Sequence, residues 1–230
     1  MRVLITGSQG FIGSNLIAKL SNSGITDITK FNKNDPPELL HRAIPNCDIV
    51  IHLAAVMRPD DKSLFKTVNE DLTKTIANLV SEHHKKMIFS SSIMAELDTD
   101  YGKSKKAGEA MLLDLGNQGI IFRLANVFGP NASPDTVVPT FCRNISRHQP
   151  ITILENREIQ FINIDDVTDA FTAAIQNFSQ FSGKINYIQP SYETTILRLA
   201  EDIFDIKKGI QKNSNQFYNL LKETYENYAP

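Results

Sequence analysis

The fold is decided by the stretch Val3-Leu4-Ile5-Thr6-Gly7-Ser8-Gln9-Gly10-Phe11-Ile12-Gly13. Val3–Ile5 is a short, fully apolar run, which is typical of a strand buried on both faces. Phe11–Leu20 has helical spacing, with Ile12, Leu16 and Leu20 on one face. Because three glycines join these segments, the sequence predicts a strand, a tight turn and a helix, the opening unit of a parallel sheet.

The glycine turn also has a chemical meaning. Glycine lacks a Cβ, so this spacing allows a sharp turn and a close approach of the backbone to a ligand. The helix that follows presents unpaired N–H groups and a partial positive charge to that ligand. We therefore predict that a dinucleotide cofactor places its pyrophosphate on Gly7, Ser8, Gln9, Gly10, Phe11, Ile12 and Gly13. The alternative is an ordinary turn that uses glycine for its dihedral angles.

The rest of the sequence continues the alternation of strands and helices. Further strands are expected at Ile25–Phe31, Asp48–Ala54, Lys86–Ser90 and Ile120–Leu124, and helices at about 63–82 and 101–114. After Gly129 the expected helices are Val137–Arg147, Asp165–Phe178, Thr195–Ile206 and Ser214–Asn227, with strands at Ile151–Leu154 and Ile159–Ile164. The fold class is α/β: a Rossmann-type, doubly wound parallel sheet with a small C-terminal substrate-binding lobe. We expect a single domain over 1–230, with its core at about 1–130 and 156–180 and the lobe at about 130–155 and 185–230.

The end of the second strand indicates which dinucleotide binds. NAD enzymes usually carry an acid there, which accepts a hydrogen bond from the ribose 2′-OH. This sequence reads Lys30-Phe31-Asn32-Lys33-Asn34, with no acid before Asp35. Lys33 could meet a 2′-phosphate, so the sequence favours NADP over NAD and places Asn32 and Lys33 at the cofactor. Alternatively, Lys30 and Lys33 are solvated loop cations.

Tyr101 and Lys105 form the expected proton-transfer pair. They are four residues apart, so on a helix that begins near Tyr101 they share one face. A free tyrosine has a pKa of about 10, and a nearby ammonium favours the phenolate, so we expect Lys105 to lower the pKa of Tyr101. Ser92, at the end of the preceding strand, could hold the oxygen of a carbonyl substrate. The alternatives are a chance Tyr–Lys pair on a helix and a simple strand-end turn at Ser90–Ser92.

The composition argues against several other classes of protein. Twenty-four Lys and Arg against 26 Asp and Glu give a net charge of −2, so neither a nucleic-acid partner nor an anionic membrane surface is expected. Cys47 and Cys142 lie far apart without ligand spacing, so we expect reduced core thiols and no metal site. The sequence has no secretory leader and no apolar run near the roughly 20 residues of a spanning helix, which predicts a cytoplasmic protein.

Together these motifs resemble the extended short-chain dehydrogenase/reductase superfamily over about residues 1–190. The matching residues are the Gly7/Gly10/Gly13 spacing, Asp48 with His52-Leu53-Ala54-Ala55, Asn69, Ser92, Tyr101, Lys105, Arg123 with Asn126-Val127-Phe128-Gly129-Pro130, and Asp165-Asp166-Val167. The resemblance implies an NAD(P)-dependent enzyme that acts on nucleotide sugars, and a homodimer formed through the helices at about 63–82 and 101–114. It makes Ser92, Tyr101 and Lys105 catalytic, adds Leu53, Ala54, Ala55, Asn69, Tyr101 and Lys105 to the cofactor site, and places Ser92 and Asn126 at the substrate.

A narrower resemblance is to the reductase half of bifunctional capsular-polysaccharide enzymes that make UDP-linked 6-deoxy-amino sugars on the way to N-acetyl-L-fucosamine. Its residues are Val56-Met57-Arg58-Pro59, Phe89-Ser90-Ser91-Ser92-Ile93, the short gap from Ser92 to Tyr101, Thr140-Phe141-Cys142 and the tail Tyr225–Pro230. It implies reduction of a 4-keto group with NADPH, without the cupin epimerase domain that follows the reductase in that subgroup.

Three positions near these motifs need separate treatment. Arg58, close to the end of the third strand, is a candidate contact for a substrate phosphate or else a surface or helix-capping residue. His52 is expected to pack or hydrogen-bond locally rather than act in catalysis. Many epimerases grip the diphosphate with an arginine two residues before the aromatic that matches Phe161, and this sequence has Ile159 there.

The two resemblances therefore imply an oxidoreductase that reduces a UDP- or dTDP-linked 4-keto-6-deoxy sugar in surface polysaccharide biosynthesis. Two alternatives stay open. One is a nucleotide-sugar epimerase with tightly bound NAD, and the other is a non-catalytic NADP-binding sensor.

Overall fold

The computed structural model describes residues 1–189, 191–210 and 215–229. These residues form two compact units, each with a hydrophobic core of its own. The first unit consists of Met1–Leu124 and Val167–Ile188, and the second of Ala125–Asp166 and Gln189–Pro230.

A parallel sheet forms the centre of the first unit. Its strands are β1 (Arg2–Thr6), β2 (Asp27–Phe31), β3 (Ile49–His52), β4 (Lys86–Ser92), β5 (Gly119–Leu124) and β8 (Ile185–Tyr187), in the order β2-β1-β3-β4-β5-β8. Every residue of β3 and β5 is buried, which explains why these strands are apolar at nearly every position. Because all five pairings are parallel, β1, β3 and β4 end at the same edge of the sheet. The predicted Rossmann-type fold class is confirmed.

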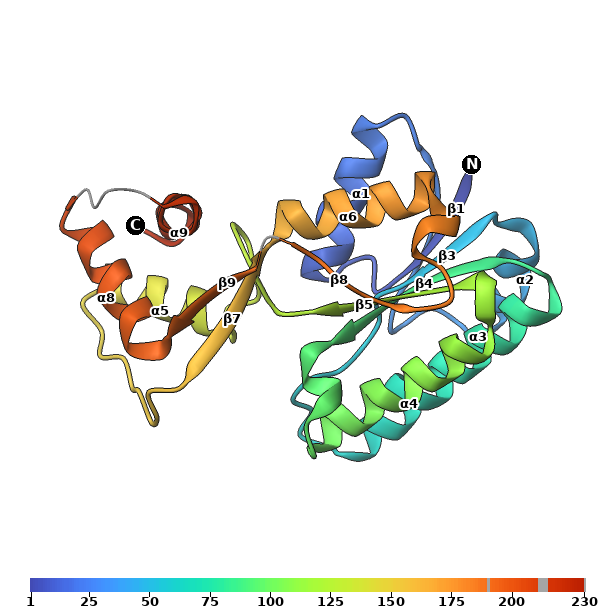
Figure 1. Ribbon diagram of the computed structural model, residues 1–230, viewed down its shortest axis with the longest axis horizontal. Coiled ribbons are helices and arrows are strands. Elements are labelled where there is room, and N and C mark those ends of the chain that lie inside the picture. Colours follow the sequence, from blue (N-terminus) through green and yellow to red (C-terminus); the bar gives the residue numbers. More distant parts are fainter. Residues whose placement is uncertain (190, 211–214, 230) are drawn as a thin grey trace. The chain divides into compact units, whose positions relative to one another are not determined.

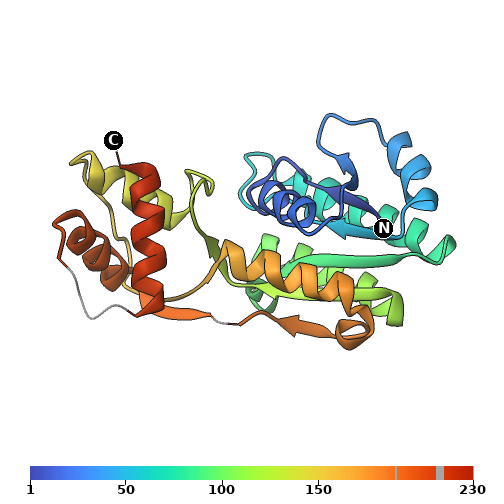
Figure 2. The same ribbon diagram turned by 90° about the horizontal axis from the view of Figure 1, so that it is seen from above.

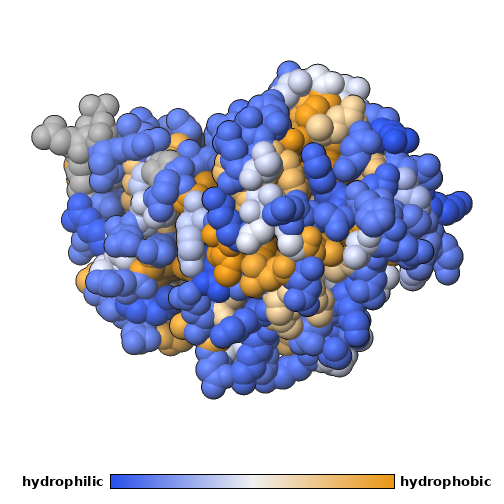
Figure 3. Space-filling model, turned by 45° about the vertical axis from the view of Figure 1, so that its right-hand side comes forward, coloured by the Kyte–Doolittle hydropathy of each residue, from blue (hydrophilic) through white to orange (hydrophobic). Residues whose placement is uncertain are grey.

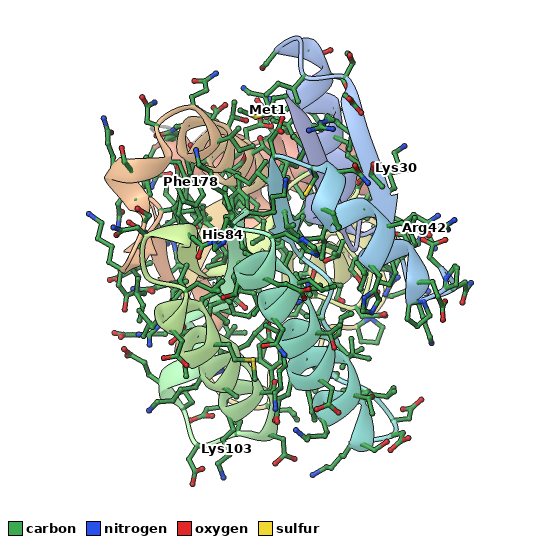
Figure 4. The ribbon with its side chains drawn as sticks, turned by 90° about the vertical axis from the view of Figure 1, so that its right-hand side faces the viewer. Met1, Lys30, Arg42, His84, Lys103 and Phe178 are labelled. Carbon is green, nitrogen blue, oxygen red and sulfur yellow. The ribbon has the colours of Figure 1, made fainter. Side chains whose placement is uncertain are left out.

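Helices cover both faces of this sheet. In Figure 1, α1 (Phe11–Asn22) and α6 (Ile164–Gln176) lie on one face, and α2 (Glu38–Asn46), α3 (Leu72–Glu82) and α4 (Asp100–Asp114) on the other. The turn that joins α3 to β4 faces the viewer in Figure 4, where His84 is labelled. Four short helical segments complete the unit: η1 (Phe65–Asp71), η2 (Ile93–Glu96), η3 (Gly116–Gln118) and α7 (Phe178–Phe181).

The second unit is a small sheet packed against helices. Strands β6 (Asn126–Phe128), β7 (Glu158–Asn163) and β9 (Tyr192–Thr195) pair in the order β6-β7-β9, with β9 antiparallel. The helices are α5 (Val137–Ser146), α8 (Ile196–Lys207) and α9 (Gln216–Tyr228), the last drawn in dark red in Figure 2. Rings of Phe128, Phe161 and Phe217 meet within 6 Å between centroids and fill its core.

Some sequence predictions differ from the structure. The strand expected at Ile151–Leu154 is wrong: Ile151 and Ile153 pack on the second core, but Leu154 is 95% exposed and no strand pairs with the segment. Its alternating pattern reflects burial on one side alone. The helix expected over 63–82 is present, but its first part, Phe65–Asp71, is a π-helix with wider turns. Helix α2 and the short strands β6, β8 and β9 were not predicted, and the start of the last predicted helix, Ser214, lies outside the described residues.

Hydrophilic side chains cover most of the face drawn in Figure 3, with apolar residues visible in patches between them. Among the described residues, no helix combines the length and the apolar character needed to cross a bilayer.

Candidate active site

The glycine turn lies tightly against the end of β3. Gly7 has a φ of +67°, and a Cβ built on it would come within 2.8 Å of the Ala54 backbone nitrogen. A Cβ on Gly13 would collide with the carbonyl oxygen of Gly7. The first glycine is therefore required by a left-handed backbone and a close approach, and the third by the packing of α1 on the turn.

The start of α1 is suited to an anionic group. Gly10 is the N-cap residue, no side chain caps the helix, and its first turn contains no acidic residue. The free N–H groups and the helix dipole are thus not neutralised by the protein itself. Residues 7–13 therefore fit the pyrophosphate of a dinucleotide, as the sequence predicts.

Asn32 braces this turn from the end of β2. Its Oδ1 atom accepts hydrogen bonds from the Ser8 hydroxyl (3.0 Å) and from the Gln9 backbone N–H (3.1 Å). The carboxylate of Asp35 accepts the Asn32 backbone N–H at 2.7 Å, so the nearest acid is engaged locally. Lys33 is exposed beside them, and Lys30 lies at the surface of β2, where Figure 4 labels it.

The predicted catalytic residues lie at the carboxyl edge of the sheet. Ser92 ends β4, Tyr101 lies in the first turn of α4, and Lys105 follows one turn later. The Thr99 side chain caps α4 by accepting the Gly102 N–H at 3.0 Å. A Cβ on Gly102 would collide with the Met94 carbonyl oxygen, so the start of α4 packs directly on the segment that follows Ser92.

Lys105 is a buried cation beside Tyr101. Its Nζ atom donates to the Ser90 carbonyl at 2.7 Å and lies 4.8 Å from the Phe89 ring centroid and 5.9 Å from the Tyr101 ring centroid. Burial lowers the pKa of Lys105 to about 8, while Glu109 acts in the opposite direction. A carbonyl and two aromatic faces thus stabilise the ammonium in a dry environment.

The pKa of Tyr101 differs from the prediction. Burial raises it to about 12, and only a hydrogen bond with Ser92 acts to lower it. The lowering by Lys105 that the sequence led us to expect is wrong for this structure, because desolvation of the phenolate dominates. Tyr101 is therefore a protonated phenol near neutral pH, the form that can donate a proton.

A buried ion pair supports the same edge of the sheet. Arg123 on β5 binds Glu109 of α4 through Nε and Nη2, both at 2.8 Å, and the Ser91 hydroxyl donates to the same carboxylate at 2.5 Å. Arg123 also bonds Glu96 and the Tyr187 hydroxyl. Glu109 was missed from the sequence, although its position on the Tyr101 helix, two turns beyond that residue, was an available signal.

The cofactor residues expected between 53 and 69 comprise a loop, Leu53–Val56, and the Asn69 side chain that supports it. The Asn69 side chain accepts the Val56 N–H at 2.8 Å and donates to the Val56 carbonyl and the Ser104 hydroxyl, both at 2.9 Å. Leu53 and Ala54 are half-buried, and Ala55 is exposed at the tip of this loop. Asn69 thus holds the loop and reaches α4.

The predicted substrate residues are divided between the two units. Arg58 is exposed in the first unit, beyond the Leu53–Val56 loop. Asn126 belongs to the second unit, where its side chain donates to the Gln160 carbonyl at 2.9 Å. No cluster of His, Cys, Asp or Glu able to hold a metal ion occurs within 1–189, 191–210 and 215–229.

Curated relatives match most of the chain. A UDP-2-acetamido-2,6-beta-L-arabino-hexul-4-ose reductase of Pseudomonas aeruginosa is 35% identical over 219 residues, which cover 91% of this chain and 58% of that protein. A dTDP-4-dehydro-6-deoxyglucose reductase of Escherichia coli is 27% identical, covering 93% of this chain and 87% of its own length. The chain thus spans little more than half the length of the first relative.

Solved structures share the fold. The capsular polysaccharide assembling protein CapF from Staphylococcus aureus superposes with a TM-score of 0.84 at 28% identity, over 100% of this chain and 66% of its own. A UDP-glucuronic acid 4-epimerase from Bacillus cereus in complex with NAD gives a TM-score of 0.84 at 18% identity, over 99% of this chain and 98% of its own. At that identity the second likeness shows the fold alone.

The glycine turn and the Tyr101–Lys105 pair both lie within the residues that match one protein family. Residues 3–187 match the family described as NAD dependent epimerase/dehydratase. Because this match covers most of the chain, the protein belongs to the NAD-dependent epimerase/dehydratase family, an enzyme family that uses a nicotinamide cofactor, and has a Rossmann-type fold.

Proposed function

We propose that this chain reduces the 4-keto group of a nucleotide-linked 6-deoxy sugar, with NADPH as the reductant. The observation that carries the proposal is the assembly of Ser92, Tyr101 and Lys105 at the carboxyl end of β4. The Leu53–Val56 loop, which the glycine turn contacts, lies at the same edge of the sheet. The names of the two similar reductases support the 4-keto sugar as substrate.

Each catalytic side chain has a distinct part in this reaction. NADPH, when bound, supplies the hydride that reduces the carbonyl carbon. Tyr101 donates its phenolic proton to the carbonyl oxygen as that oxygen gains negative charge, so the product is an alcohol. Ser92 donates a hydrogen bond to the same oxygen, and the Lys105 ammonium would supply positive charge beside the reacting groups and orient the cofactor ribose. The raised pKa of Tyr101 suits a proton donor.

We propose that residues at the end of β2 determine the preference for NADP over NAD. Asn32 stands where NAD enzymes usually carry a carboxylate, and Asp35 is engaged with the Asn32 backbone. Asn32 itself carries no charge that would repel a 2′-phosphate, and the exposed Lys33 is the next residue along the chain. Both features support NADP over NAD.

The remaining parts of the proposal concern the substrate and the assembly. Arg58 would contact the nucleotide sugar, and residues 63–82 and 101–114 would form a homodimer seam. The two buried free cysteines, Cys47 and Cys142, support a reducing compartment such as the cytoplasm.

The test follows NADPH absorbance with UDP- and dTDP-linked 4-keto-6-deoxy sugars. The expected result is one NADPH oxidised for each sugar reduced, with NADH a poorer donor. Conversion of a nucleotide sugar without net NADPH oxidation would contradict the proposal and indicate an epimerase. Cofactor binding without conversion of any sugar in the panel would instead favour a sensor.

A further inference from the structure

His52 lies in the middle of a buried chain of hydrogen bonds in the first unit. It ends β3, it is fully buried, and it pairs in register with Thr6 at the end of β1. Its ring Nδ1 atom is 2.6 Å from the Thr6 hydroxyl, and its Nε2 atom is 2.8 Å from the Thr73 hydroxyl. One imidazole thus connects a strand end to helix α3.

The hydrogen bonds through His52 can have only one order of donors and acceptors. Thr73 donates its hydroxyl proton to the Asn69 carbonyl at 2.7 Å, so its oxygen must accept the proton of His52 Nε2. Burial lowers the pKa of His52 to about 3, and the charge of Lys105 acts in the same direction, so the ring is neutral. With its one proton on Nε2, the ring accepts the Thr6 hydroxyl proton at Nδ1.

At one end of this hydrogen-bond network, Thr6 fixes the start of the Leu53–Val56 loop. The Thr6 hydroxyl oxygen accepts the Ala54 N–H at 3.2 Å, and the Thr6 carbonyl accepts the Leu53 N–H at 3.2 Å. The position of the His52 ring therefore sets where this part of the loop begins.

The Thr73 end fixes the rest of the loop and the start of α4. Asn69, whose carbonyl accepts from Thr73, holds both backbone groups of Val56 and donates to Ser104. Ser104 donates in turn to the Tyr101 carbonyl at 2.8 Å. The loop and the catalytic turn of α4 thus share one buried network.

The His52 ring also reaches the catalytic lysine by stacking. It lies 5.6 Å from the Phe89 ring centroid at an interplanar angle of 24°, and Lys105 Nζ contacts that same Phe89 ring. The His52 carbonyl accepts the Ser90 hydroxyl at 3.3 Å, while the Ser90 carbonyl accepts Lys105.

We propose that His52 is a positioning residue: through Thr6 and Thr73 it sets the distance between the Leu53–Val56 loop and the Tyr101–Lys105 turn of α4. The effect of His52 on turnover rests on the proposed function, whereas the hydrogen-bond network of His52 does not depend on that function. Loss of one link lets the loop shift against Tyr101, and a misplacement of about 1 Å costs up to about 100-fold in rate.

A pair of threonine variants tests the proposal. Thr73→Val removes the acceptor of His52 while keeping the shape of the side chain. Thr172→Val is the matched control, because Thr172 is also buried and donates to the carbonyl four residues earlier, at 2.7 Å, but lies on α6 outside the chain of bonds. We expect a kcat about 10- to 100-fold lower in Thr73→Val, with the Kd for NADPH nearly unchanged, and a normal kcat in Thr172→Val. Equal kcat values in the two variants would overturn the proposal.

Two further measurements do not depend on turnover. Long-range proton–nitrogen NMR of the histidine side chains should find His52 protonated at Nε2 alone from about pH 5 to 8, and a proton on Nδ1 or a titration near pH 6.5 would contradict the proposal. His52→Gln keeps one donor and one acceptor, so it should retain more of the fluorescence enhancement of bound NADPH than His52→Leu. If the wild type reduces no 4-keto sugar, the proposed function fails. The role of His52 is then decided by the fluorescence enhancement of bound NADPH: a lower enhancement in Thr73→Val than in Thr172→Val supports it, and equal enhancement in the two variants contradicts it.

Discussion

The two units differ in how their buried polar side chains are connected. In the first unit the buried polar residues are joined by directional hydrogen bonds: Thr6, His52, Asn69, Thr73, Ser91, Lys105, Glu109 and Arg123. In the second unit aromatic rings fill the core, and within the described residues the buried Tyr192 hydroxyl lacks a hydrogen-bond partner. Hydrogen bonds fix individual atoms, whereas apolar packing fixes mainly volume and shape. We therefore expect the first unit to fix the positions of the predicted catalytic atoms more strictly than the core of the second unit fixes its own side chains.

The largest expected difference between the units comes from removing one tyrosine hydroxyl in each. Tyr101→Phe should lower kcat by about 100- to 10,000-fold with the Kd for NADPH unchanged, because it deletes the proton donor. Tyr192→Phe deletes a buried hydroxyl that lacks a partner in the described structure, so kcat should stay at the wild-type value. Steady-state kinetics and NADPH titration measure both. Similar losses in the two variants would remove the distinction between the units.

A buried and an exposed ion pair give the next comparison. Arg123→Met leaves the buried Glu109 carboxylate without its bidentate partner, so the free energy of unfolding should fall by about 3–5 kcal/mol. Arg198→Met in the second unit removes pairs that Arg198 makes from a half-exposed position, and should cost about 1 kcal/mol or less. Urea denaturation of both variants provides the measurement. A loss of stability in Arg123→Met as small as that in Arg198→Met would show that the buried pair does not hold α4 to β5.

His52 should make the stability of the protein fall in acid. Its folded pKa of about 3 lies below the ordinary value of 6.5, so between these pH values the unfolded chain binds more protons than the folded one. The stability is present above pH 6.5 and is lost as the pH falls toward 3. The difference in unfolding free energy between the wild type and His52→Gln should therefore shrink over this window. A difference independent of pH would contradict a neutral, buried His52.

The smallest effect is expected at the end of β2. Lys33→Ala should reduce the preference for NADPH over NADH by about fivefold or less, because an exposed cation contributes little to binding. Lys103→Ala is the control: Lys103 is an exposed cation that pairs with Asp98 at the start of α4, where Figure 4 labels it. Cofactor titrations with both variants measure the ratio. An unchanged ratio in Lys33→Ala would place the 2′-phosphate elsewhere.

Local patterns in the sequence were sufficient to predict the main strands and helices of the first unit. The apolar strands, the glycine turn and the Tyr101–Lys105 spacing are short-range features, and the structure brings these residues to one edge of the sheet. The chain of bonds through His52 was not predictable in detail, because Thr6 and His52 are 46 residues apart and meet only through strand register.

Predictions failed where burial depends on tertiary packing. Ile151–Leu154 alternates like a strand but has no partner strand, and three-residue strands such as β6 and β8 are too short to produce a period. The pKa of Tyr101 was expected to fall beside Lys105, but the sequence does not reveal how thoroughly the fold desolvates the phenol.

The most direct test of the account follows a label from the cofactor into the sugar. NADPH deuterated at the transferred position is incubated with a UDP-linked 4-keto-6-deoxy sugar, and the product is analysed by NMR. The account predicts deuterium at C4 of the sugar, one NADPH consumed per product, and loss of this product in Tyr101→Phe. A product without deuterium at C4, or one formed equally well by Tyr101→Phe, would contradict it.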